Sequence, residues 1–117
     1  MIADHDPAVR DFLERMLAQA GYHVHEAANG REVLELIYRL GDRIALVVMD
    51  VDMPEMDGLR VLKSVTSFFP STRVLMIEEE PGDAREQELL DAGADVFLAK
   101  PLDSFRLMEA VRAILPE

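Results

Sequence analysis

Apolar residues follow two kinds of spacing along this chain. In the longer segments, apolar residues recur every three or four positions, as on one face of a helix. Between these segments lie short runs that are almost wholly apolar. One short run, Ile44–Met49, is apolar at every position, which is typical of a strand buried on both faces of a parallel sheet. The pattern predicts five strands alternating with five helices, with the strands at Met1–Ala3, Tyr22–His25, Ile44–Met49, Val74–Ile77 and Val96–Ala99.

The helical segments have recognisable ends. Asp6 is placed to cap the first helix, and Pro7 suits its first turn. Asn29, with Glu32 three residues later, has the pattern of a capping box for the second. The third helix is expected to begin at Asp57 and the fourth at Asp83, and the last is expected around Phe105–Leu115. The predicted helix stops are Gly21, Gly41, Pro70 and Gly93. The predicted apolar faces include Val9, Phe12, Leu13, Met16, Leu17 and Ala20 in the first helix, Val33, Leu34, Ile37 and Tyr38 in the second, and Phe105, Met108, Val111 and Leu115 in the last.

Strict alternation of strands and helices predicts an α/β fold with right-handed crossovers and helices on both faces of the sheet. The length of 117 residues suits one domain, residues 1–117, with a doubly wound five-stranded parallel sheet of the flavodoxin-like kind, strand order 2-1-3-4-5. In such sheets ligands bind outside the carboxyl ends of the strands, at the point where the strand order reverses.

Composition narrows the function further. The chain has no cysteine, which excludes disulfides, cysteine-ligated metals and thiol catalysis. Its net charge of -11 argues against direct binding of nucleic acid or of anionic membranes. It has neither a signal-peptide pattern nor an apolar run long enough to span a bilayer, so we expect a cytoplasmic domain. The thin first run and the end at Glu117 leave open whether it is a stand-alone protein or part of a longer one.

Charged residues directly follow the predicted strands. Asp4 follows the first strand, Asp50 the third, Glu78 the fourth and Lys100 the fifth. Adjacent first and third strands bring Asp4 and Asp50 together, and two such carboxylates repel unless a cation lies between them. A hard divalent cation such as Mg²⁺ suits carboxylate oxygens. Two carboxylates, a metal ion and a lysine form a place where a phosphoryl group could be held.

With these residues the chain resembles the receiver domains of two-component response regulators, over essentially its whole length. Three motifs in matching order carry the resemblance, and they occupy residues 3–7 (ADHDP), 47–58 (VVMDVDMPEMDG) and 93–101 (GADVFLAKP). The resemblance implies a signalling switch rather than a metabolic enzyme, with at most self-phosphorylation from small donors and autodephosphorylation. It implies phosphoryl transfer from a histidine kinase or a histidine phosphotransfer protein, and an output partner that the sequence does not identify.

The resemblance also implies roles for single residues. Asp50 matches the phosphoacceptor, and Asp4, Asp50 and the backbone carbonyl of Asp52 match the Mg²⁺ ligands. Lys100 matches the lysine that pairs with the phosphoryl group. Further matches are Pro101, expected to follow a cis peptide bond, and Phe97, at the place of an aromatic residue whose rotamer reports phosphorylation.

Two residues depart from the family pattern. His5 stands where a second acid is usual, which puts Mg²⁺ affinity in doubt and makes His5 either a bystander or a ligand for Mn²⁺, Ni²⁺ or Zn²⁺. Glu78 stands where a threonine or serine is usual, which puts the phosphate-coupled switch in doubt. Pairing of Lys100 with Glu78 is an alternative to its role at the phosphoryl group.

Two other functions stay open from the sequence. His5 and Glu78 are compatible with a pseudo-receiver that binds its partner without phosphorylation. The Asp50-Val51-Asp52 stretch after an apolar strand also occurs in phosphohydrolases of the haloacid-dehalogenase type, but it is placed late in this chain, with no room for a cap domain.

Overall fold

The structure is a computed structural model that describes residues 1–54, 57–79 and 82–115. Glu55 and Met56 of the second motif, and Glu117 at the end of the chain, lie outside the described residues. In chain order, and with a short 3-10 turn at Gly41–Arg43, the elements are β1 (Ile2–Ala3), α1 (Pro7–Gln19), β2 (Glu26–Ala27), α2 (Gly30–Leu40), β3 (Leu46–Asp50), α3 (Gly58–Phe68), β4 (Arg73–Glu78), α4 (Asp83–Asp91), β5 (Val96–Ala99) and α5 (Ser104–Ile114).

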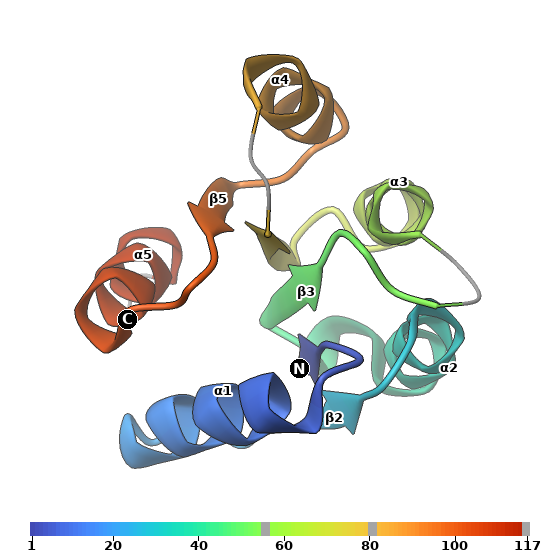
Figure 1. Ribbon diagram of the computed structural model, residues 1–117. Coiled ribbons are helices and arrows are strands. Elements are labelled where there is room, and N and C mark those ends of the chain that lie inside the picture. Colours follow the sequence, from blue (N-terminus) through green and yellow to red (C-terminus); the bar gives the residue numbers. More distant parts are fainter. Residues whose placement is uncertain (55–56, 80–81, 116–117) are drawn as a thin grey trace.

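The strands form one sheet in the order β2-β1-β3-β4-β5, and every pair is parallel. This confirms the predicted flavodoxin-like α/β fold. Helices α1 and α5 lie on one side of the sheet, and α2 and α3 lie on the other (Figure 1). The order reverses at β1, so the ends of β1 and β3 meet at the switch point, where the fold places ligands.

Two apolar cores, one on each face, follow from the period-two alternation of strand side chains. Val47 and Met49 of β3 pack toward α2 and α3, in a core that also includes Leu89 of α4. Their neighbours Leu46 and Val48 pack toward α1 and α5. Every residue of β3 is buried, as the unbroken apolar run Ile44–Met49 predicts.

The helix ends agree with the capping predictions. The carboxylate of Asp6 accepts from the backbone N–H of Ala8, and the side chain of Asn29 accepts from the N–H of Glu32. Asp57 caps α3 in the same manner. The predicted glycine stops after α1 and α2 are confirmed, because both glycines have a positive φ, a conformation that side chains disfavour. α4 begins at Asp83 as predicted, but the residue at its cap position is Gly82.

The second strand lies later than predicted. The residues that pair with β1 are Glu26 and Ala27, whereas the run Tyr22–His25 precedes the strand. Only the carbonyl of His25 joins the ladder, where it accepts from the N–H of Ile2 at 2.8 Å. Tyr22 is 38% exposed, so its apolar ring does not mark a buried strand.

Three predicted core residues are solvent-facing. Tyr38 is 54% exposed on α2, and its ring meets that of Phe68 edge-on. Phe105 is 71% exposed, since α5 buries Leu107 together with Val111 instead. Ala20 is exposed at the end of α1. None of the helices in the described ranges is both long and apolar enough to cross a membrane.

Candidate phosphoacceptor and metal site

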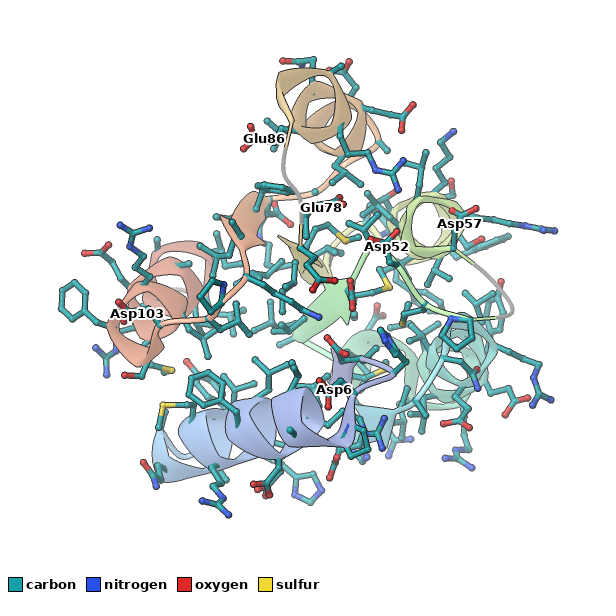
Figure 2. The ribbon with its side chains drawn as sticks, in the orientation of Figure 1. Asp6, Asp52, Asp57, Glu78, Glu86 and Asp103 are labelled. Atoms are coloured by element: carbon teal, nitrogen blue, oxygen red, sulfur yellow. The ribbon has the colours of Figure 1, made fainter. Side chains whose placement is uncertain are left out.

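The candidate site lies where β1, β3 and β5 end. The register pairs Ala3 with Met49, so Asp4 and Asp50, each the next residue along, leave adjacent strands side by side. Asp4 is fully buried and Asp50 is 1% exposed. Asp52 and Glu78 lie at the same end of the sheet, close to the end of β3 (Figure 2). The structure therefore brings together the carboxylates that the sequence places at strand ends.

Lys100 joins the two buried carboxylates. Its Nζ lies 3.0 Å from Oδ2 of Asp50, to which it donates a hydrogen bond, and 3.1 Å from Oδ2 of Asp4. The peptide bond between Lys100 and Pro101 is cis, as predicted. One ammonium thus compensates two buried negative charges that would otherwise repel each other.

Backbone N–H groups hold the other oxygens of the two carboxylates. Oδ1 of Asp4 accepts from the N–H of Asp6 at 2.8 Å, and Oδ1 of Asp50 accepts from the N–H of Asp52 at 3.0 Å. Each carboxylate is therefore bonded on one oxygen by the residue two positions later and approached on the other by Lys100. This arrangement fixes the orientation of both side chains before any ligand arrives.

Burial has opposite effects on the two charged partners. It raises the pKa of the Asp50 carboxyl, although the N–H of Asp52 and the ammonium of Lys100 act in the other direction. Burial alone would lower the pKa of Lys100, but its bonds to Asp50 and Asp4 outweigh this effect and raise that pKa. Lys100 is therefore a permanent cation at neutral pH, available to an anionic group on Asp50.

Gly58 supports the end of β3 from the first turn of α3. A Cβ at this position would lie 2.7 Å from the carbonyl oxygen of Asp50 and 2.7 Å from Cα of Val51. Such contacts with backbone atoms are too short for any side chain. The glycine of the second motif thus allows α3 to approach the end of β3.

His5 lies at the open side of the acid pair. Its Nδ1 is 3.7 Å from Oδ1 of Asp4 and 3.7 Å from Oδ2 of Asp50, and its side chain is 52% exposed. Ligand atoms of these three residues lie within 4.8 Å of one another. The sequence left His5 as either a bystander or a ligand, and its position suits a ligand.

Glu78 pairs with a residue that the sequence did not indicate. Its Oε2 lies 3.5 Å from Nε of Arg85 on α4, while neither atom has hydrogen-bond geometry with any described group. Lys100 is engaged by Asp4 and Asp50, so the alternative pairing of Lys100 with Glu78 is wrong. Burial, and then the charge of Asp52, raise the pKa of Glu78. The sequence signals this partner only by the basic Arg85 in the first turns of α4, the helix that follows β4.

Phe97 and the exposed Asp52 stand apart from the acid pair. Phe97 lies on β5, half buried against the core that faces α2 and α3. Asp52 reaches the site through its backbone N–H, which bonds to Asp50. The role of Phe97 as a rotamer switch and that of the Asp52 carbonyl as a metal ligand stay predictions.

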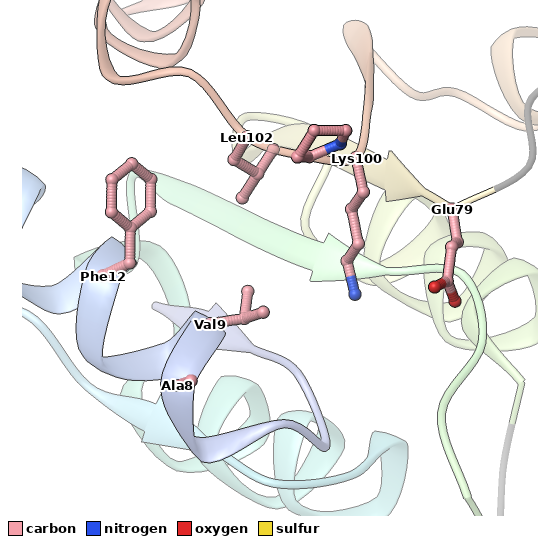
Figure 3. A pocket seen from close by; sticks show the side chains of 7 residues that line it. Ala8, Val9, Phe12, Glu79, Lys100 and Leu102 are labelled. Atoms are coloured by element: carbon pink, nitrogen blue, oxygen red, sulfur yellow. The ribbon is translucent and has the colours of Figure 1, made fainter.

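An apolar groove of about 480 Å³ opens beside Lys100. Figure 3 shows it between α1 and the segment that follows β5. Most of its walls are apolar, and Lys100 and Glu79 are the charged groups among its lining residues, which are Ala8, Val9, Phe12, Glu79, Lys100, Pro101 and Leu102.

Comparison with known proteins places this geometry in a family. Residues 1–112 match the response regulator receiver domain. The chain belongs to the response regulator receiver domain family. It is 39% identical over 115 residues to response regulator MprA of Mycolicibacterium vanbaalenii and 37% identical over 115 residues to that of Mycobacterium leprae. These matches cover 98% of the chain but 49% and 50% of the relatives, so the chain spans about half their length.

Solved structures of similar proteins have the same fold. Chemotaxis protein CheY4 of Vibrio cholerae aligns with a TM-score of 0.89 and 31% identity, over 97% of this chain and 95% of that one. A chain of the CheX–CheY–BeF3–Mg²⁺ complex from Borrelia burgdorferi aligns with a TM-score of 0.94 and 26% identity, over 99% and 87%. These findings favour neither the pseudo-receiver nor the phosphohydrolase alternative.

Proposed function

We propose that this receiver domain accepts a phosphoryl group on Asp50 from a phosphohistidine of a kinase or phosphotransfer protein. The observation that carries the proposal is the buried Asp50 carboxylate, held on one oxygen by backbone and bonded on the other by Lys100 at 3.0 Å. A carboxylate oxygen of Asp50 attacks phosphorus, the P–N bond of the phosphohistidine breaks, and the electron pair leaves with the donor imidazole. The product is an aspartyl phosphate.

Lys100 stabilises the transferred group through its positive charge. The raised pKa of Lys100 keeps this side chain an ammonium, and its four-carbon stem allows Nζ to move from the carboxylate of Asp50 to a phosphoryl oxygen. Asp4 then keeps the ammonium near the site, because it already lies 3.1 Å from Nζ. The same lysine thereby balances the charge before and after transfer.

The residues at the site fit a divalent cation. Oδ2 of Asp4 is buried, and among the described groups it finds no hydrogen-bond donor with suitable geometry. Asp4, Asp50 and the carbonyl of Asp52 would hold Mg²⁺, which would neutralise part of the negative charge on the phosphoryl oxygens. One of the similar solved structures is a complex that contains Mg²⁺ and BeF3.

The groove beside Lys100 supports a protein donor. Most of its lining residues are apolar, and one of them is Lys100, which bonds to Asp50, so a partner docked there would lie beside the carboxylate that must meet the donor imidazole. The output of the domain is a separate question, because its curated relatives are about twice as long. The cytoplasmic localisation expected from the sequence stays a prediction.

The test is phosphodonor labelling of the purified chain with acetyl phosphate or phosphoramidate and Mg²⁺, read by intact mass. Wild type should gain the mass of one phosphoryl group, and Asp50→Asn should gain none. Asp52→Asn is the matched control, because it changes an exposed neighbouring acid and should still be labelled. Labelling that persists in Asp50→Asn would contradict the proposal. An unlabelled wild type that binds a partner regardless of donor would favour the pseudo-receiver.

A further inference from the structure

We propose that the acid pair of this receiver selects a borderline transition-metal cation of the zinc, nickel and cobalt class over Mg²⁺, with His5 as the selecting ligand. The inference rests on the proposed function, because it concerns the metal ion of the same site. It depends on a side chain that departs from the family pattern and on the position that the fold gives it.

The position of His5 suits direct coordination. Two ligand atoms bound to one ion at about 2.1 Å can be no more than about 4.2 Å apart. Nδ1 of His5 lies 3.7 Å from an oxygen of Asp4 and 3.7 Å from an oxygen of Asp50, so both separations already satisfy this limit. The imidazole carries no other described bond, and a half-exposed ring can turn without disturbing the core.

A second observation points to a cation between these groups. Asp4 is fully buried, and its Oδ2 lies 3.1 Å from Nζ of Lys100 but has no donor with hydrogen-bond geometry among the described residues. Its neighbour Lys100 donates its hydrogen bond to Asp50 instead. Oδ2 of Asp4 is thus held by an ion pair alone and keeps an acceptor position that a cation could fill.

The chemistry of the donors sets the preference. Mg²⁺ prefers hard oxygen ligands and depends on their negative charge, and His5 supplies a neutral nitrogen where the family pattern has an acid. Imidazole nitrogen is a favoured ligand for Zn²⁺, Ni²⁺ and Co²⁺, which bind mixed nitrogen and oxygen sites more tightly than Mg²⁺ does. Two carboxylates and one imidazole supply three of the four ligands of a tetrahedral zinc site, all of types that Zn²⁺ accepts.

The test compares Zn²⁺ with Mg²⁺ on the whole 117-residue chain, without phosphodonor. Calorimetric titration in a non-chelating buffer gives both affinities, and NMR of the ¹⁵N-labelled chain reports which imidazole binds. Wild type should bind Zn²⁺ at least about tenfold more tightly than Mg²⁺, because the imidazole of His5 suits Zn²⁺ and stands in place of a charged oxygen that Mg²⁺ prefers. The Nδ1 resonance of His5 should shift on addition of Zn²⁺.

Variants separate His5 from the other two histidines of the chain. His23 and His25 have ring centroids 5.0 Å apart and could compete with His5 for Zn²⁺, so His23→Gln/His25→Gln is the matched background. In that background Zn²⁺ binding should persist, His5→Gln should weaken it at least about tenfold, and His5→Asp should turn the preference toward Mg²⁺.

Zinc binding that disappears with His23 and His25, or that His5→Gln leaves unchanged, would overturn the inference. So would a His5 resonance that does not move with Zn²⁺. The outcome is separable from that of the proposed function, because the titration needs no phosphoryl transfer. A chain that binds Zn²⁺ through His5 but is labelled on Asp50 neither with Mg²⁺ nor with Zn²⁺ would refute the phosphoacceptor proposal alone.

Discussion

Replacement of Glu78 by threonine should increase phosphorylation of this domain. Glu78 ends β4, next to the β3 strand that carries Asp50, and it is only 6% exposed. Adjacent strands are about 4.8 Å apart, so a phosphoryl group on Asp50 comes close to a buried carboxylate. Each pair of unit charges at about 5 Å repels by about 3 kcal/mol when the effective dielectric constant is about 20.

The ion pair between Glu78 and Arg85 reduces this repulsion. Arg85 lies 3.5 Å from the carboxylate, and its positive charge offsets part of the negative charge that a phosphoryl group would meet. A net repulsion of about 1–2 kcal/mol corresponds to a factor of about 5–30 in the ratio of phosphorylated to unphosphorylated chain. Glu78→Thr should raise this ratio by that factor.

Two further variants divide the effect between charge and hydroxyl. Glu78→Ala removes the repulsion without supplying a donor, so it should recover the electrostatic part alone. Arg85→Ala leaves the carboxylate without its partner and should lower the ratio below that of wild type. Arg85→Ala should have little effect once Glu78 is threonine, because the two changes act through the same charge.

The assay is the steady-state phosphorylated fraction at one fixed acetyl phosphate concentration, read by intact mass. NMR shifts around Phe97 report the conformational response in parallel, and they should be larger in Glu78→Thr than in wild type. Equal phosphorylated fractions in wild type, Glu78→Ala and Glu78→Thr would refute the electrostatic reasoning. A full response around Phe97 in wild type would show that Glu78 does not impede the switch.

Three other predictions concern the surroundings of the site. Because burial raises the pKa of Glu78, the folded chain binds this proton more tightly than the unfolded chain, and the free energy of unfolding falls as pH rises from the ordinary value of 4.5 through the raised pKa. Glu78→Gln should reduce that fall in urea unfolding measured at a series of pH values, and an unchanged pH profile would count against a raised pKa. Lys100→Met should lower the free energy of unfolding by about 3 kcal/mol at neutral pH, since it leaves two buried carboxylates uncompensated; a loss below about 1 kcal/mol would show that they are solvated or protonated. Gly58→Ala should cost about 1–3 kcal/mol, because its Cβ meets the carbonyl of Asp50 at 2.7 Å. The control is Gly82→Ser, which should not lower stability, because a Cβ there has nothing within 4 Å and serine suits the cap position of α4; equal losses in the two variants would refute the close approach.

The sheet and the acid pair could be predicted because each depends on a local pattern. The unbroken apolar run that ends at Asp50 requires cover on both faces, and the alternation with helices requires parallel strands. Parallel order then brings Asp4 beside Asp50 and Lys100 within reach of both. Helix ends were predictable for the same reason, as with Asp57 and Asn29, whose side chains bond to N–H groups within three residues.

Features that depend on packing between elements could not be predicted in the same way. The second strand is two residues long, and its position is set by pairing with β1, so the more apolar Tyr22 is a poor guide to it. Tyr38 and Phe105 have helical spacing suited to burial, but each helix presents a neighbouring face to the sheet. Arg85 could not be predicted as the partner of Glu78, because the pair depends on how α4 packs beside the end of β4, which no pattern in the sequence specifies.

Identification of the phosphorylated residue tests the central claim most directly. The chain is incubated with acetyl phosphate and Mg²⁺, reduced with borohydride so that an aspartyl phosphate becomes homoserine, and digested for peptide mass spectrometry. The account predicts homoserine at position 50 and unmodified aspartate at Asp4 and Asp52. Homoserine at another aspartate, or its absence from a chain that has gained the mass of a phosphoryl group, would contradict the assignment of Asp50 as the phosphoacceptor.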